Sequence, residues 1–131
     1  MDIFVYGTLT EPERVASVVD AFVFVGAAVL EGCHPVAGRY PTLAPGGQTA
    51  GRLLRTDDVD ALDTYEGVDE GLYARVSAPR TDGGTAAVYV GDPDALDVEE
   101  AVDWPGTGPF AERVRRYFEA ESVVVRPEHS S

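Results

Sequence analysis

The chain has 131 residues, 44% of them hydrophobic, with 23 acidic and 10 basic side chains and a formal net charge of -13. This length suits one compact domain over residues 1–131, in which we expect 127–131 to be a flexible tail. The negative charge repels phosphate backbones and anionic lipids, and we see no long apolar run or charged leader. Nucleic-acid binding and membrane insertion are therefore excluded as main roles, and we expect a cytoplasmic protein.

All ten basic residues are arginine, and lysine is absent. An acidic chain with this deficit resembles the proteins of salt-loving organisms, in which high salt screens the repulsion between carboxylates. The alternative is an acidic but otherwise ordinary mesophilic protein. The single cysteine excludes an intrachain disulfide.

The first part of the chain predicts a strand, a glycine turn and a helix. Residues 2–6 form a β-branched and aromatic run that is typical of a buried strand, and Gly7 ends it. Pro12 fits the first turn of the following helix, where Thr10 and Glu13 have the spacing of a capping box.

The glycine turn itself is a candidate anion site. Backbone N–H groups left free beside a helix N-terminus attract carboxylates and can stabilise a developing oxyanion. Most strand–glycine–helix junctions are only connections, so this feature alone does not assign a function.

The middle of the chain predicts two strands separated by a loop. Residues 21–30 form a long strand-like run with a bulge at Gly26, and residues 48–55 form a second run. Proline and glycine recur through residues 31–47, which predicts an irregular loop that contains Tyr40.

A short helix is predicted over residues 59–66, with Thr56 or Asp57 as its cap and Gly67 as its end. Val59, Leu62 and Tyr65 then share one apolar arc.

Glu66 breaks the pattern of that helix. At about 100° per residue, Glu66 falls between Val59 and Leu62, whereas Asp63 and the other aspartates lie off the apolar arc. A carboxylate in this position is costly unless something compensates it, which makes Glu66 the leading candidate for chemistry.

The rest of the chain predicts a hairpin, a helix and a last strand. Residues 72–79 and 85–91 flank a turn at 81–84, residues 109–120 have helical spacing, and residues 122–126 form a short strand. Residues 92–108 are expected to be irregular. Because strands dominate and two or three helices accompany them, the predicted class is α+β.

Other candidate sites are weaker. Cys33 and His34 have the types of a nucleophile and a base, but neighbours in sequence seldom face each other, and no spacing of metal ligands is present. The acidic residues at 57–60 lack the glycine and distal glutamate of a calcium loop. Asp69 and Glu70 could form a carboxylate pair with Glu66, although an acidic surface needs no such function. No metal site is predicted.

Two motifs carry a resemblance to a known family. The sequence Val-Tyr-Gly-Thr-Leu at residues 5–9 resembles the signature loop of the γ-glutamylcyclotransferase-like family, which includes γ-glutamylamine cyclotransferases and plant AIG2-like proteins. Residues 62–67, followed by Tyr-Ala-Arg at 73–75, resemble its second signature, in which the glutamate is the catalytic acid/base. Tyr40, Gly51 and residues 87–89 follow in a family-like order, so the resemblance covers about residues 2–91.

The resemblance implies a small mixed β-barrel flanked by two or three helices. It implies a cofactor-free enzyme that cyclises a γ-glutamyl amine or peptide to 5-oxoproline and releases the amine, with Glu66 as general acid/base. The substrate-binding residues that it implies are Tyr6, Gly7, Thr8, Leu9, Tyr40 and Tyr73.

Two alternatives stay open at this point. One is a non-catalytic domain that binds a γ-glutamyl or other amino-acid-like ligand, and the other is an interaction protein whose pocket is vestigial. The presence of Glu66 counts against the first. Tyr73 is equally compatible with a role in the site and with packing.

Overall fold

The computed structural model describes residues 1–37, 42–98 and 102–128. The strands are β1 (Asp2–Val5), β2 (Val23–Val36), β3 (Thr42–Arg55), β4 (Tyr73–Pro79), β5 (Thr85–Gly91) and β6 (Val124–Pro127). The helices are the 3₁₀ helix η1 (Gly7–Thr10), α1 (Pro12–Val18), α2 (Val59–Glu66) and α3 (Phe110–Ala120).

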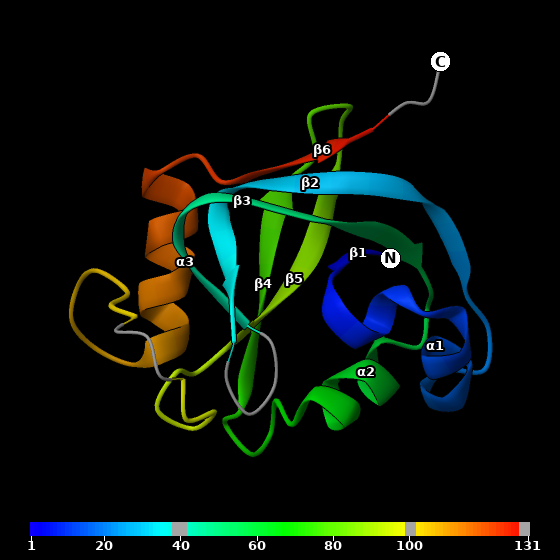
Figure 1. Cartoon of the computed structure of the whole chain (residues 1–131), viewed down its shortest axis with the longest axis horizontal. Coiled ribbons are helices and arrows are strands. Elements are labelled where there is room, and N and C mark those ends of the chain that lie inside the picture. The colour runs from blue at the N-terminus through cyan, green and yellow to red at the C-terminus, as the bar shows by residue number, and fades with distance from the viewer. Residues whose placement is uncertain (38–41, 99–101, 129–131) are drawn as a thin grey trace.

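A six-stranded sheet with the order β4-β5-β1-β3-β2-β6 curls into a half-barrel. Its neighbouring strands are antiparallel except β1 and β5, which are parallel. The two edges approach each other where the Thr81 N–H donates to the Val125 carbonyl at 3.0 Å, beside a bridge between Arg80 and Val125. Figure 1 shows α3 on one side of the curled sheet and α1 with α2 on the other. The predicted α+β class, a small mixed barrel flanked by helices, is confirmed.

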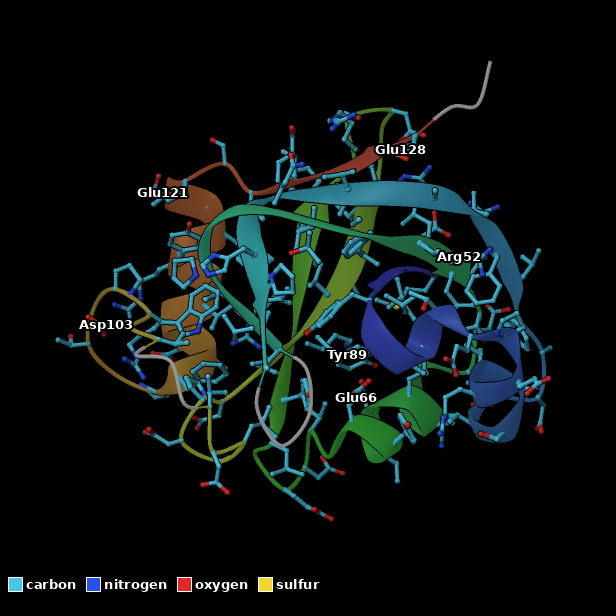
Figure 2. All side chains as sticks on the ribbon, in the orientation of Figure 1. Arg52, Glu66, Tyr89, Asp103, Glu121 and Glu128 are labelled. Carbon is cyan, nitrogen blue, oxygen red and sulfur yellow. The ribbon has the colours of Figure 1, made fainter. Side chains whose placement is uncertain are left out.

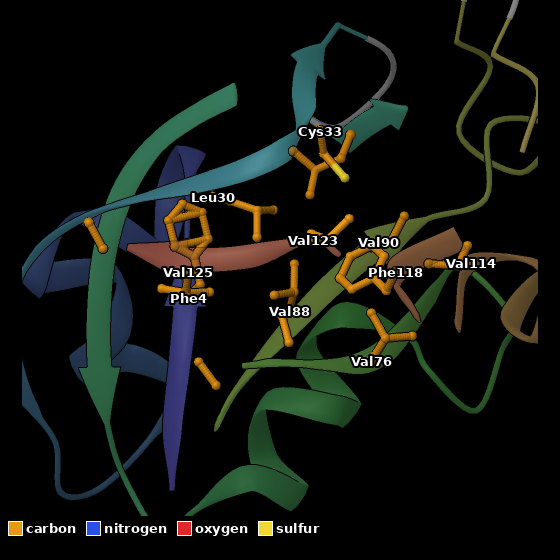
Figure 3. Packing of buried hydrophobic residues seen from close by; sticks show 14 of the residues in the cluster. Phe4, Leu30, Cys33, Val76, Val88, Val90, Val114, Phe118, Val123 and Val125 are labelled. Carbon is orange, nitrogen blue, oxygen red and sulfur yellow. The ribbon is translucent and has the colours of Figure 1, made fainter. Parts of the chain in front are cut away.

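Strand alternation divides the buried residues into two clusters. Phe4 of β1 packs into the α3 cluster, which also contains Val88 and Phe118 (Figure 3). Its neighbours Ile3 and Val5 point to the opposite face and pack with α1 and α2 in the second cluster. Because both faces of β1 are covered, the three consecutive residues Ile3, Phe4 and Val5 are all apolar. The expected strand at the start of the chain is thus confirmed.

Gly51 of β3 allows β1 to come close. A Cβ atom added at this position would lie 2.2 Å from the Val5 carbonyl oxygen and 2.7 Å from Cζ of Phe4. Any side chain at Gly51 would therefore push β1 away from β3.

The loop predicted over residues 31–47 was wrong wherever the structure describes it. Residues 31–36 extend β2 and residues 42–47 extend β3, so that His34 pairs with Ala44 and Cys33 with Pro45. Residues 38–41, with Tyr40 among them, lie outside the described residues.

The prolines in these two strand extensions are the reason why a loop was predicted there. Proline lacks the N–H that a central strand needs on both sides. However, β6 pairs with β2 only over Ala28–Glu31, and β1 pairs with β3 only over Arg52–Arg55. Pro35 and Pro45 lie outside both ranges, where a strand has one partner and tolerates proline. The bulge expected at Gly26 is confirmed by a register shift between Phe24 and Gly26.

The hairpin of β4 and β5 and the helices α2 and α3 also match their predictions. The cap of α2 differs, because Asp58 is the N-cap residue and makes no side-chain capping bond. Thr56 instead accepts a bond from the Asp58 N–H through its hydroxyl, at 3.1 Å.

The C-terminal pairing extends further than expected. Pro127, placed in the predicted tail, pairs with Ala28, and the Glu128 N–H donates to the Ala27 carbonyl at 2.9 Å. Residues 129–131 lie outside the described residues. Within the described ranges, no helix is long and apolar enough to cross a membrane.

Candidate active site

A pocket of about 420 Å³ lies between the C-terminal end of α2, the η1 turn and strands β4 and β5. Figure 2 shows Glu66 and Tyr89 beside each other in this region. The pocket is lined by Phe4, Val5, Tyr6, Leu9, Arg14, Tyr65, Glu66, Leu72, Tyr73 and Tyr89.

Glu66 is the last residue of α2 and faces this pocket. Gly67 ends the helix in the left-handed conformation, with φ of 70°, as the sequence predicted. Burial raises the pKa of the Glu66 carboxyl from 4.5 to about 7. The helix C-terminus, with its partial negative charge, also disfavours an ionised carboxylate. Glu66 can therefore both accept and donate a proton near neutral pH.

Three tyrosines form the wall around Glu66. Tyr73 and Tyr89 are only 8% and 3% exposed, and the Tyr6 hydroxyl donates to the Tyr89 carbonyl at 2.5 Å. Burial raises the pKa of Tyr6 well above its ordinary value, and the neighbouring Tyr73 and Glu66 raise it further. Burial likewise raises the pKa of Tyr89. The phenols of Tyr6 and Tyr89 therefore stay protonated at neutral pH, whereas Glu66 titrates there.

Asp63 ties α2 to the sheet beneath the pocket. Its carboxylate accepts a hydrogen bond from the Tyr89 hydroxyl at 2.6 Å and pairs with the Arg75 guanidinium at 3.2 Å. Arg75 and Tyr89 are direct partners across β4 and β5. Because Asp63 lies one helical turn before Glu66, this contact holds the helix end that carries Glu66. The sequence had placed Asp63 off the apolar arc of the helix, without these partners.

The η1 turn forms the opposite edge of the pocket. Gly7 has φ of 68°, a conformation that favours glycine, and the Thr10 hydroxyl donates to the Gly7 carbonyl at 2.7 Å. The predicted capping box between Thr10 and Glu13 is therefore wrong, and Glu11 is the N-cap residue of α1. The leading N–H groups of a 3₁₀ helix have no partner within the helix.

Comparison with known protein families identifies the family of the chain. Residues 3–106 match the family model described as gamma-glutamyl cyclotransferase, AIG2-like. The chain belongs to this family. The match includes both the η1 turn and the end of α2, which form the two edges of the pocket. No curated protein matches the sequence.

Solved structures share the cyclotransferase-family fold. One described as gamma-glutamyl cyclotransferase superposes with a TM-score of 0.58 at 16% identity, covering 91% of this chain and 98% of that one. An uncharacterised Homo sapiens protein gives 0.59 at 18% identity, covering 88% and 97%. An Arabidopsis thaliana protein gives 0.53 at 26% identity, covering 92% and 87%.

Most of the site residues expected from the family resemblance come together. Tyr6, Leu9, Glu66 and Tyr73 line the pocket, while Gly7 is exposed in the turn between Tyr6 and Leu9. The backbone of Thr8 belongs to η1. Tyr40, the remaining member of the set, falls outside the described residues.

Several pocket residues of this cyclotransferase-family chain were not predicted from the sequence. Tyr89 is one, although its family-like setting on β5 was noted. Arg14 is another, because a helix pattern does not show which pocket a charged side chain faces. Tyr65 was expected on the buried arc of α2 but is 44% exposed, since the arc opens onto the pocket there.

The weaker candidates of the sequence lie elsewhere. Cys33 is fully buried in the α3 cluster, and burial raises the pKa of its thiol to about 12, so it is a poor nucleophile. The ring of His34 bonds to the Gly46 carbonyl through Nδ1 at 2.9 Å. In the part of the chain that the structure describes, no group of three acidic, histidine or cysteine side chains could hold a metal ion.

Proposed function

We propose that this protein is a γ-glutamyl cyclotransferase that converts a γ-glutamyl amine or peptide to 5-oxoproline and releases the amine. The observation that carries the proposal is Glu66, a partly buried carboxyl with a pKa of about 7, in the pocket between α2 and η1 of a cyclotransferase-family chain. A group with this pKa is suited to general acid–base catalysis at neutral pH.

The reaction that we propose needs only proton transfers around one ring closure. Ionised Glu66 takes a proton from the substrate α-ammonium, and the freed amine nitrogen attacks the γ-carbonyl carbon to form a new C–N bond. Protonated Glu66 then gives the proton to the leaving nitrogen, and the original amide C–N bond breaks. The ring nitrogen gives its remaining extra proton to the carboxylate of Glu66, from which it passes to solvent. The products are 5-oxoproline and the free amine, so no water or cofactor is consumed.

The oxyanion formed during ring closure needs hydrogen-bond donors. We assign this role, or the binding of the glutamyl α-carboxylate, to the backbone N–H groups of Gly7, Thr8 and Leu9. The phenol of Tyr73 and the aromatic walls hold the γ-glutamyl chain in a bent conformer. Since the reacting groups belong to one molecule, fixing this conformer supplies much of the rate increase.

The direct test is to incubate the purified protein with a panel of γ-glutamyl amines and γ-glutamyl amino acids and to detect 5-oxoproline by mass spectrometry. We expect turnover of at least one compound, with the released amine in equal amount. Binding of these compounds without 5-oxoproline would indicate the alternative, a non-catalytic binding protein on the same fold.

A further inference from the structure

The pocket contains two formally charged side chains of opposite sign. These are Glu66 at the end of α2 and Arg14 on α1, while the other lining residues are aliphatic or aromatic. Glu66 is partly buried, whereas Arg14 is exposed. The positive charge therefore lies at the solvent end of the pocket, and the proton-exchanging carboxyl lies deeper.

Arg14 also stands apart from most other arginines of the chain. Within residues 1–37, 42–98 and 102–128, it forms no ion pair and no side-chain hydrogen bond. Among the other arginines that the structure describes, only Arg115 on α3 shares this property, and it does not line the pocket. The remaining described arginines are engaged with carboxylates or backbone carbonyls, namely Arg52, Arg55, Arg75, Arg80, Arg113, Arg116 and Arg126.

An unpaired guanidinium is unexpected in so acidic a chain. With a formal net charge of -13, the protein repels anions over most of its surface. One free arginine at the pocket entrance offsets this repulsion locally. A guanidinium also matches a carboxylate geometrically, because it can donate two parallel hydrogen bonds.

We propose that Arg14 binds a carboxylate on the leaving part of the substrate, so that the preferred substrates are γ-glutamyl amino acids or peptides with a free carboxylate. This inference rests on the proposed function. In the proposed reaction, Glu66 exchanges a proton with the reacting amine, and the η1 turn binds the oxyanion or the glutamyl α-carboxylate. The leaving group then extends toward solvent, where Arg14 lies. Derivatives of neutral amines lack the anion that Arg14 would bind.

Binding measurements separate this inference from catalysis. Titration calorimetry on the Glu66→Gln protein compares γ-glutamylalanine with γ-glutamylalaninamide, which differ only in the carboxylate of the leaving group. We expect the carboxylate ligand to bind about tenfold more tightly, as one charged hydrogen-bonding contact supports. Adding Arg14→Gln abolishes the preference, and Arg14→Lys restores part of it. Arg115→Gln, which removes the same charge from another exposed arginine, leaves the preference intact.

Several outcomes overturn the inference. Equal affinity for the two ligands, or no binding of either, rules out a carboxylate contact at Arg14. Equal weakening of both ligands by Arg14→Gln places the glutamyl α-carboxylate on Arg14 instead. Failure of the proposed function looks different: wild-type protein makes no 5-oxoproline from either compound, while the Arg14-dependent preference persists.

Discussion

Helices α2 and α3 both bury an apolar side against the curled sheet, yet they end in different surroundings. Helix α3 buries Val114 and Phe118, and the Tyr117 hydroxyl accepts from the Gly46 N–H at 2.9 Å and donates to the Gly32 carbonyl at 2.7 Å. Helix α2 buries Leu62 and then ends on a carboxyl at the edge of a pocket.

The aromatic residues follow the same division. Beside α3, Trp104 packs edge-on against Phe110 and Tyr117 and is only 1% exposed, so aromatic rings fill the space. Around Glu66, Tyr6 and Tyr89 form a wall and leave a cavity. At α3 a tyrosine with a satisfied hydroxyl serves packing, and at α2 buried tyrosines surround Glu66, whose pKa burial raises to about 7. The open pocket at the α2 end is consistent with the proposed catalytic role of Glu66, whereas the filled space at the α3 end contributes to the packing of the fold.

The largest expected effect is that of Glu66→Gln on turnover. Glutamine keeps the size and hydrogen bonding of the side chain but cannot exchange the proton, so we expect kcat to fall at least about a hundredfold in a folded protein. The matched control is Glu70→Gln, an identical change at an exposed position. Steady-state assays of 5-oxoproline formation measure both. Equal kcat for wild type and Glu66→Gln would contradict the catalytic role.

The second effect is a pH-dependent difference in stability between the wild-type protein and the Glu66→Gln variant. The Glu66 carboxyl loses its proton near pH 4.5 in the unfolded chain but near pH 7 in the folded one. Between these values the folded state holds more protons, so this group lowers the free energy of unfolding as pH rises, by up to about 3 kcal/mol. Urea unfolding at pH 5 and pH 8 should show that the Glu66→Gln variant lacks this fall in the free energy of unfolding with rising pH. Parallel pH profiles for variant and wild type would argue against a perturbed Glu66.

The third effect comes from the contact beneath α2. Asp63→Asn removes the charge that pairs with Arg75 and weakens the bond from Tyr89, so we expect a loss of about 2 kcal/mol in unfolding free energy. Because the helix end then moves, kcat should also fall, while KM changes little. Asp60→Asn, at an exposed position on the same helix, is the control. A loss of stability with unchanged kcat would show that Asp63 does not position Glu66.

The fourth prediction concerns α3 and tests the difference between the surroundings of the two helices. Tyr117→Phe leaves the Gly46 N–H and the Gly32 carbonyl without their partner, which should cost about 1 kcal/mol in unfolding free energy. Turnover should stay at the wild-type value, since Tyr117 does not line the pocket. Denaturant titration and the 5-oxoproline assay test the two parts. A large drop in kcat would contradict the expectation that α3 affects stability but not turnover.

The smallest effect is that of salt, which should act on both regions alike. Screening of the net charge of -13 should raise the melting temperature between low and molar KCl, by the equivalent of about 1 kcal/mol. Thermal melts across this range measure it. A flat or falling melting temperature would favour the ordinary mesophilic interpretation.

The sequence by itself determined the local elements and the anomaly within one of them. Apolar periodicity and the glycine end of α2 located Glu66, and the β4–β5 hairpin followed from its turn residues. These features depend on neighbours a few positions apart, so periodicity and turn chemistry are enough to predict them.

Only the tertiary structure decided which groups surround Glu66. Asp63 meets Tyr89 and Arg75 because β4 and β5 pair beside α2, and Arg14 reaches the pocket because α1 lies at its entrance. The strand arms at Pro35 and Pro45 likewise depend on where β1 and β6 stop pairing. Such contacts join residues far apart in the chain, and the pattern of a single segment does not specify its partners.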